Sequence, residues 1–204
     1  MGEFVRDSAL ASSGLLVPKF GGPGVKPYQP PGLWNEVSLD GNVRFVQDHG
    51  ENLYRRSIYT YWKRSAPAPA FTIFDATTRE KCTLRRGRTN TPLQALVTMN
   101  DVQYIEAARA LAQRVLLAET DTDAQLKLAW RLATSRTPAD STIATLREAY
   151  QQELSVFQAD PERAKALLSI GESPRDEAID PAVHAAMTNV TSLILNLDAT
   201  LTRG

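Results

Sequence analysis

The chain has 204 residues, of which 43% are hydrophobic and 23% charged, as in an ordinary globular protein. Its 23 basic and 23 acidic residues give a formal net charge of zero, so no global charge attracts nucleic acid or an anionic membrane. One cysteine and two histidines exclude an intrachain disulfide and c-type haem attachment. We therefore expect no metal site and no cofactor in this chain. No apolar run is long enough to span a membrane.

The N-terminal part of the chain alternates a short helix with irregular sequence. Apolar spacing predicts a helix over residues 3–16, which a run of glycines and prolines over residues 14–24 ends. The proline-rich residues 25–52 predict a long irregular stretch. Residues 53–64 fit either an alternating strand or one aromatic helical face. Residues 66–74 then read as a stiff linker that leads into an extended apolar run.

The C-terminal part repeats one start signal, a capping residue followed by helical periodicity. Thr91 and Pro92 open a helix whose apolar side we expect to carry Leu93, Leu96, Val97 and Met99. Further helices are predicted to start at Asn100 or Asp101, at Asp121 or Thr122, at Thr137-Pro138, at Asp160-Pro161 and at Asp180-Pro181, the last of which continues to Leu201. Short loops between helices indicate an antiparallel helical bundle.

These elements predict a mainly α fold. We expect a single domain over residues 1–204, in which an irregular, Pro/Gly-rich and aromatic N-terminal part, residues 1–84, packs on a helical bundle formed by residues 85–204.

The junction of these two parts is rich in arginine and amide side chains. Arginines beside the free N–H groups of a helix N-terminus make a candidate anion site for phosphate, sulfate or carboxylate. The residues of this candidate site are Arg85, Arg86, Arg88, Asn90 and Gln94. In the alternative interpretation, the arginines hold acidic residues of the irregular part and the ends of helices.

Acidic residues flank the arginines, and paired carboxylates perform acid–base chemistry on sugars. Asp75, Glu80 and Asp101 are candidates by position, and His49 lies in a polar loop where it would be accessible. The spacing fixes no distance between them, and pairing with arginine would suit structural salt bridges. Both interpretations stay open for these residues.

Basic residues also bracket the aromatic run 54–64, namely Arg55, Arg56, Lys63 and Arg64. Arginine interleaved with aromatic rings can bind single-stranded nucleic acid. With a net charge of zero and no recognisable binding motif, nucleic acid is not an expected partner. Basic ends on an aromatic core segment explain the same pattern.

Five ordered motifs carry a family resemblance: GPxVKPYQPPGLW at 22–34, YRRSxYTxWKR at 54–64, FDA at 74–76, RTNTPLQALxxxND at 88–101 and LNLD at 195–198. Together they resemble the C-terminal domain of unknown function of large planctomycete-type secreted, cytochrome-c-associated proteins. The resemblance implies a helical fold, so it favours helix for residues 54–64. It also implies export, partners in the upstream domains or another subunit, and a fragment that begins inside the family domain.

The resemblance supplies no catalytic residues, so function stays unassigned at this point. The leading hypothesis is a non-catalytic helical interaction or structural module of a larger exported protein. The alternative is part of a hydrolase acting on polysaccharide or sulfated sugar through the arginine-rich anion site. Single-stranded nucleic-acid binding through residues 54–64 is the third.

Overall fold

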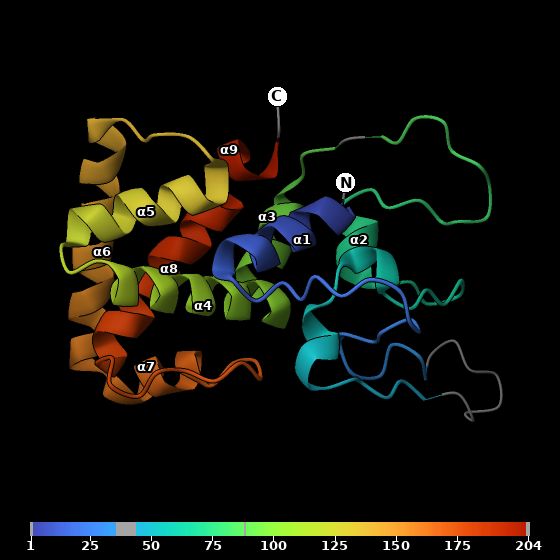
Figure 1. The fold of residues 1–204 in the computed structure, drawn as a ribbon, viewed down its shortest axis with the longest axis horizontal. Coiled ribbons are helices and arrows are strands. Elements are labelled where there is room, and N and C mark those ends of the chain that lie inside the picture. The colour runs from blue at the N-terminus through green and yellow to red at the C-terminus, as the bar shows by residue number, and fades with distance from the viewer. Residues whose placement is uncertain (1, 36–43, 88, 203–204) are drawn as a thin grey trace. The chain divides into compact units, whose positions relative to one another are not determined.

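The computed structural model describes residues 2–35, 44–87 and 89–202. Within these residues the fold is mainly α, as predicted, and two isolated bridges, Val17 with Arg55 and Val25 with Thr60, are its only β-type pairings. Figure 1 shows the elements. In chain order they are α1 (Gly2–Ser13), η1 (Gly50–Tyr54), η2 (Ser57–Tyr59), α2 (Pro69–Ile73), α3 (Pro92–Asn100), α4 (Val102–Ala118), α5 (Thr122–Thr134), α6 (Asp140–Ala159), α7 (Pro161–Leu168), α8 (Pro181–Asn196) and α9 (Asp198–Leu201).

Most predicted helix starts are confirmed, and their caps have the expected chemistry. Asp101, Asp121, Asp160 and Asp180 each accept a hydrogen bond from a backbone N–H in the first turn of the following helix. Such caps satisfy N–H groups that have no intrahelical partner. At the other end, Gly14 adopts φ +84° just after α1, as the predicted glycine stop requires.

Four local predictions were wrong. Residues 53–64 form neither a continuous helix nor a strand, because two short 3-10 helices alternate there with bridge residues Arg55 and Thr60. The expected extended run 71–74 is mostly helical, since Pro69 starts α2. Helix α6 starts at Asp140 rather than at Thr137-Pro138. The last helix breaks after Asn196, where Leu197 is extended before α9 begins.

The chain forms two compact units, one comprising Met1–Asp7 with Leu16–Val97 and the other Ser8–Leu15 with Thr98–Gly204. Helices α1 and α3 contribute residues to both. The expectation of a single domain stays a prediction.

The first unit is poor in helix, and its core combines apolar and charged residues. The most buried apolar side chains include Val25 and Leu53, each 1% exposed, and Phe71 at 2%. Two arginines, Arg6 and Arg55, are equally buried. Charged groups are rarely buried to this degree unless they are paired or hydrogen-bonded, so these two side chains indicate a polar network within the core.

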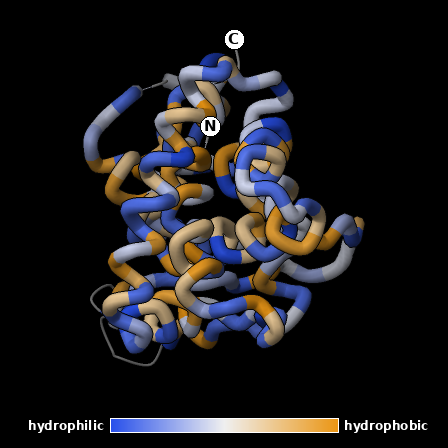
Figure 2. The backbone as a smooth tube through the Cα atoms, turned by 90° about the vertical axis from the view of Figure 1, so that its left-hand side faces the viewer, coloured by the Kyte–Doolittle hydropathy of each residue, from blue (hydrophilic) through white to orange (hydrophobic). Residues whose placement is uncertain are grey.

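The second unit is a helical bundle centred on α8, which contacts α4, α5, α6, α7 and α9. Small residues lie where α4 and α8 meet, and Ala108 and Ala185 are both fully buried. The Oγ1 of Thr191 donates to the Ala108 carbonyl at 2.8 Å, which requires the two helices to approach closely. Figure 2 shows hydrophobic and hydrophilic stretches alternating along the backbone, as in helices that turn one face to a core.

None of the helices within the described ranges is long and apolar enough to cross a membrane.

Gly171, after α7, provides a test of how tightly the second unit is packed. Its φ is +88°, and a Cβ atom placed there would overlap the carboxylate of Glu106. We expect Gly171→Ala to lower the free energy of unfolding by roughly 2 kcal/mol or more, since strain at positive φ adds to the displacement of Glu106. Urea unfolding measures the change.

Gly14→Ala is the matched control, because Gly14 has a φ of +84° but only ordinary contact with Arg114 at 3.9 Å. Equal losses in the two variants would show that the overlap with Glu106 contributes nothing.

Candidate functional site

The predicted anion site lies around the N-terminus of α3, where the loop that follows α2 returns. Asp75, directly after α2, adopts φ +58° and turns its carboxylate toward this loop. Its Oδ2 accepts from the Thr89 backbone N–H at 2.8 Å, and its Oδ1 accepts from the Thr89 hydroxyl at 3.0 Å. The carboxylate proposed for acid–base chemistry therefore serves to close the loop.

Gln94 makes the second connection at this site, and its residue is only 6% exposed. Its Nε2 donates to the Ile73 carbonyl at 2.9 Å and to the Thr89 hydroxyl at 3.1 Å. Its Oε1 accepts from the Thr91 backbone N–H at 3.3 Å, which is one half of a capping box. We call Asp75, Thr89, Thr91 and Gln94 the α3 lock.

The arginines of the predicted site have different surroundings. Arg86 donates to the Glu3 carboxylate at 2.8 Å, so it ties the loop to the start of α1. Arg85 and Asn90 are exposed and make no hydrogen bond to any other described residue. Arg88 lies outside the described residues. Of the predicted anion-site residues, Gln94 therefore belongs to the α3 lock, Arg86 is paired with Glu3, and Arg85 and Asn90 are exposed to solvent.

The remaining acid–base candidates are spread over the chain. Glu80 pairs with Arg64 at 3.2 Å on the exposed surface. Asp101 caps α4 by accepting from the Gln103 backbone N–H at 2.9 Å. His49 is exposed and directly precedes η1. Asp75, Glu80 and Asp101 have structural contacts that account for their positions, and a catalytic role for any of the four candidates stays a prediction.

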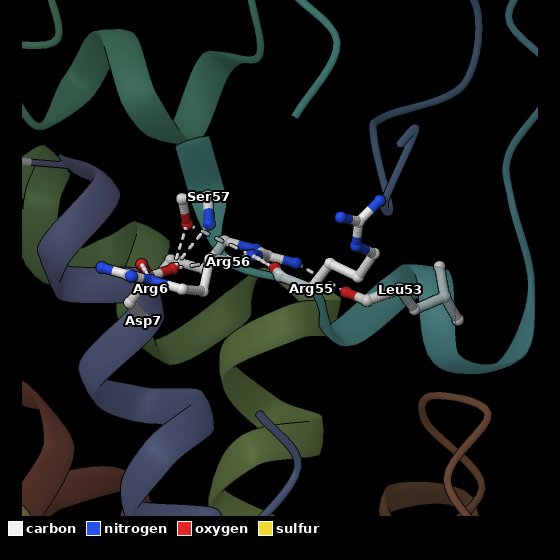
Figure 3. Close-up of polar contacts among 6 residues, drawn as sticks. All are labelled: Arg6, Asp7, Leu53, Arg55, Arg56 and Ser57. Atoms are coloured by element: carbon white, nitrogen blue, oxygen red, sulfur yellow. Dashed lines mark hydrogen bonds and ion pairs between the residues drawn. The ribbon is translucent and has the colours of Figure 1, made fainter. Parts of the chain in front are cut away.

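A buried network in the first unit was missed by the sequence analysis (Figure 3). Arg6 of α1 is 2% exposed, and its guanidinium donates to the Leu53 carbonyl at 2.5 Å and to the Arg55 carbonyl at 2.8 Å. It also donates to the Ser57 hydroxyl at 3.1 Å. Asp7 lies beside it and accepts from the Ser57 backbone N–H at 2.8 Å and from its hydroxyl at 2.6 Å. Residues 53–57 are thus hydrogen-bonded to α1 through two adjacent side chains.

Arg55 extends the network to the glycine-rich turn. Its guanidinium donates to the carbonyls of Pro23, at 3.0 Å, and of Lys19 and Gly21. It also lies over the ring of Tyr59, with 4.1 Å from Cζ to the centroid. One signal in the sequence could have revealed such burial: Arg6 follows Val5 and falls one turn before Ala9 and Leu10, inside the apolar stripe of its helix.

Other cations of the first unit cover aromatic rings in the same way. Lys63 lies 4.5 Å from the centroid of the Trp34 ring, and Arg79 lies 4.6 Å from that of Trp62. Arg55 is buried and occupied by backbone carbonyls, so it is not available to a phosphate backbone. The basic and aromatic residues of 54–64 therefore bind parts of their own chain, which argues against the nucleic-acid hypothesis.

Within the parts of the chain that the structure describes, no three His, Cys, Asp or Glu side chains gather as a metal ion would require. Cys82 is exposed.

A family model described as PSD1, a protein of unknown function (DUF1553), matches residues 1–150, which include both the α3 lock and the buried Arg6 network. Comparison with curated proteins finds no match, and neither does comparison with solved structures.

The Arg6 network is tested by Arg6→Lys, which keeps the charge but loses the planar fork that reaches two carbonyls at once. Leaving buried carbonyl groups without a donor costs about 1–3 kcal/mol each, so we expect the free energy of unfolding to fall by roughly 2–4 kcal/mol. Chemical denaturation measures this. Arg56→Lys is the matched control, because Arg56 is 45% exposed and lies 3.7 Å from the same Asp7. A similar loss of unfolding free energy in Arg56→Lys would contradict the prediction that the buried fork of Arg6 is responsible.

The α3 lock is tested by a double-mutant cycle of Asp75→Asn and Thr89→Val. Thr89→Val removes a hydroxyl of nearly the same shape, and we expect a loss of about 1 kcal/mol, moderate because the site is exposed. Once Thr89 is valine, Asp75→Asn should have a smaller effect than in the wild type, since the two residues share their bonds. Thermal unfolding of the four proteins gives the coupling, and strictly additive effects would mean that the lock does not exist.

Proposed function

Because the chain belongs to the PSD1 family of proteins of unknown function (DUF1553), we propose its role from its own residues: a non-catalytic interaction module within a larger protein. The observation that carries this proposal is the orientation of α3. Its residues Leu93, Leu96 and Met99 are 53%, 56% and 44% exposed, whereas Gln94 and Thr98 are 6% and 2% exposed. The helix therefore turns its apolar side to solvent and its polar side to the protein.

Hydrogen bonds explain why α3 has this orientation. Gln94 is bound within the α3 lock, and the Thr98 hydroxyl donates to the Asn196 Oδ1 at 2.6 Å. Residues 94 and 98 are one turn apart, so their bonds fix the rotation of the helix about its axis. Leu93, Leu96 and Met99 follow on the opposite side at three-residue spacing. The sequence predicted an apolar side of four residues on this helix, and the structure exposes three of them while Val97 is half-buried.

A row of exposed apolar side chains on a helix is a favourable contact surface for another protein. Burying one leucine side chain contributes about 1.5–3 kcal/mol, and contiguous exposed apolar groups mark interaction sites more often than chance. The occupant that we propose is another domain of the same larger protein. The resemblance to planctomycete-type secreted proteins supports export, an upstream domain beside this one and a cytochrome-c-like module in the same polypeptide, with no cofactor in this chain.

The hydrolase alternative has weaker support. It needs carboxylates available for acid–base chemistry, but Asp75 is bound by Thr89, Glu80 by Arg64, and Asp101 caps α4. Exposed Arg85 favours the hydrolase alternative, because it is a cation of the predicted anion site that the structure describes as open to solvent.

The interaction proposal is tested by co-purification of this chain with the separately expressed upstream domain. Leu96→Glu places a charge at the centre of the row and should weaken association at least about tenfold, since a charge cannot be buried there without a partner. Because Leu96 is exposed, the thermal midpoint of the isolated chain should stay near that of the wild type.

Leu117→Glu is the matched control, since Leu117 is 60% exposed on α4 and lies outside the row. The proposed surface would be refuted if the wild-type chain does not associate with the upstream domain, or if Leu96→Glu associates as strongly as the wild type.

A further inference from the structure

The segment between α7 and α8 in Figure 1, residues 171–180, is here called the strap. Three side chains of α4 form hydrogen bonds with it. Glu106 Oε1 accepts from the Ser173 backbone N–H at 2.6 Å. Arg109 Nη2 donates to the Ser173 carbonyl at 2.6 Å and to its hydroxyl at 2.7 Å. Gln113 Oε1 accepts from the Asp176 backbone N–H at 2.7 Å. These three residues follow one another at about one turn of α4, so they bind the strap along one line.

His184 of α8 lies beneath this attachment and is fully buried. Its Nε2 is 3.0 Å from the Arg109 carbonyl oxygen. A carbonyl oxygen only accepts, so Nε2 carries a proton, and the neutral ring presents Nδ1 as a bare lone pair. Within the described chain Nδ1 has no hydrogen-bond partner, and neither has the buried Nη1 of Arg175 in the strap. A second proton on the ring would therefore enter a buried position that offers it no acceptor.

The charges around His184 also oppose a second proton. The pKa of His184 is lowered, and burial is the largest cause. The guanidinium groups of Arg109 and Arg175 lower this pKa further. The hydrogen bond to the Arg109 carbonyl and the charge of Asp176 act in the opposite direction and raise it. On α6, the pKa of the Tyr150 phenol is raised first by burial and then by Asp180. The charged side chains of α5 and α7 that are exposed to solvent are Lys127, Arg131, Glu162, Arg163 and Lys165.

We propose that the strap is a pH-operated latch, in which protonation of His184 adds a third cation beside Arg109 and Arg175 and releases residues 171–180 from α4. Release breaks the bonds to Ser173 and Asp176 and exposes the Glu106 carboxylate, while α4 and α8 remain packed. The latch is independent of the interaction surface proposed on α3, because it involves only α4, α8 and the strap.

The direction of the pH effect follows from the lowered pKa. In the released strap His184 returns toward its ordinary pKa of 6.5. The closed strap is therefore fully favoured above pH 6.5, and it loses stability as the pH falls from 6.5 toward the lower pKa of the closed state. Over that interval the released state binds up to one proton more than the closed state.

Amide hydrogen exchange at about pH 7.5 and about pH 5.5, corrected for the intrinsic effect of pH on exchange, tests the latch. The opening constant of the Ser173 and Asp176 amides should rise by a factor that approaches about ten per pH unit below 6.5, the limit for one proton. Amides of α5 should keep their protection. His184→Gln should remove the response, because its amide can still donate to the Arg109 carbonyl but cannot gain a proton.

A pH response that persists in His184→Gln, or a loss of protection in α4 and α8 together with the strap, would overturn the proposal. If His184→Gln does not fold, Arg175→Gln provides the same test, since removing one cation should raise the His184 pKa and reduce the acid-induced opening. Ring titration by NMR in a His49→Gln background isolates the His184 signal. Arg136→Gln is the matched control, because Arg136 is exposed and is not among the charges that shift the pKa of His184. An unchanged titration of His184 in Arg175→Gln would refute the electrostatic cause.

Discussion

The first unit depends on one constraint: an irregular backbone has no ladder of its own, so its buried carbonyl groups need donors from elsewhere. Arg6 and Arg55 supply them. The guanidinium of Arg6 binds the carbonyl of Arg55, and the guanidinium of Arg55 binds the turn that contains Pro23. Arginine suits this role because it is always charged and offers five donors in a fixed plane. The chain thereby orders three remote segments with two side chains.

The same use of polar groups determines what α3 exposes. Gln94 and Thr98 would lie outward on a helix that buried its leucines, but their amide and hydroxyl are bound inside the protein. Rotating α3 to bury Leu93 and Leu96 would leave the Ile73 carbonyl without its Gln94 donor, and a buried unpaired carbonyl costs about 1–3 kcal/mol. The exposed apolar row of α3 is thus a consequence of the lock.

The sequence predicted best those features that are local. Aspartates followed by proline or helical periodicity located the starts of α7 and α8, because a cap acts within its own first turn. The sequence predicted least well the features that depend on partners far away in the chain. The apolar spacing of the sequence does not identify the partners of Arg6 and Gln94, which are the distant carbonyls of Leu53 and Ile73. The prediction for residues 53–64 was wrong for the same reason, since hydrogen bonds to α1 determine their conformation and the spacing of their own residues does not.

Both units therefore use polar side chains on α-helices to hold backbone that is not α-helical. In the first unit Arg6 and Asp7 of α1 bind residues 53–57, and in the second Glu106, Arg109 and Gln113 of α4 bind the strap. The two attachments differ in one respect: the contacts described above for the Arg6 network come from arginine, aspartate and serine, whereas in the second unit His184 contacts the carbonyl of Arg109. A shift to mildly acidic pH should consequently act on the strap more than on the attachment of residues 53–57, since the donors that Arg6 supplies to that attachment stay charged throughout.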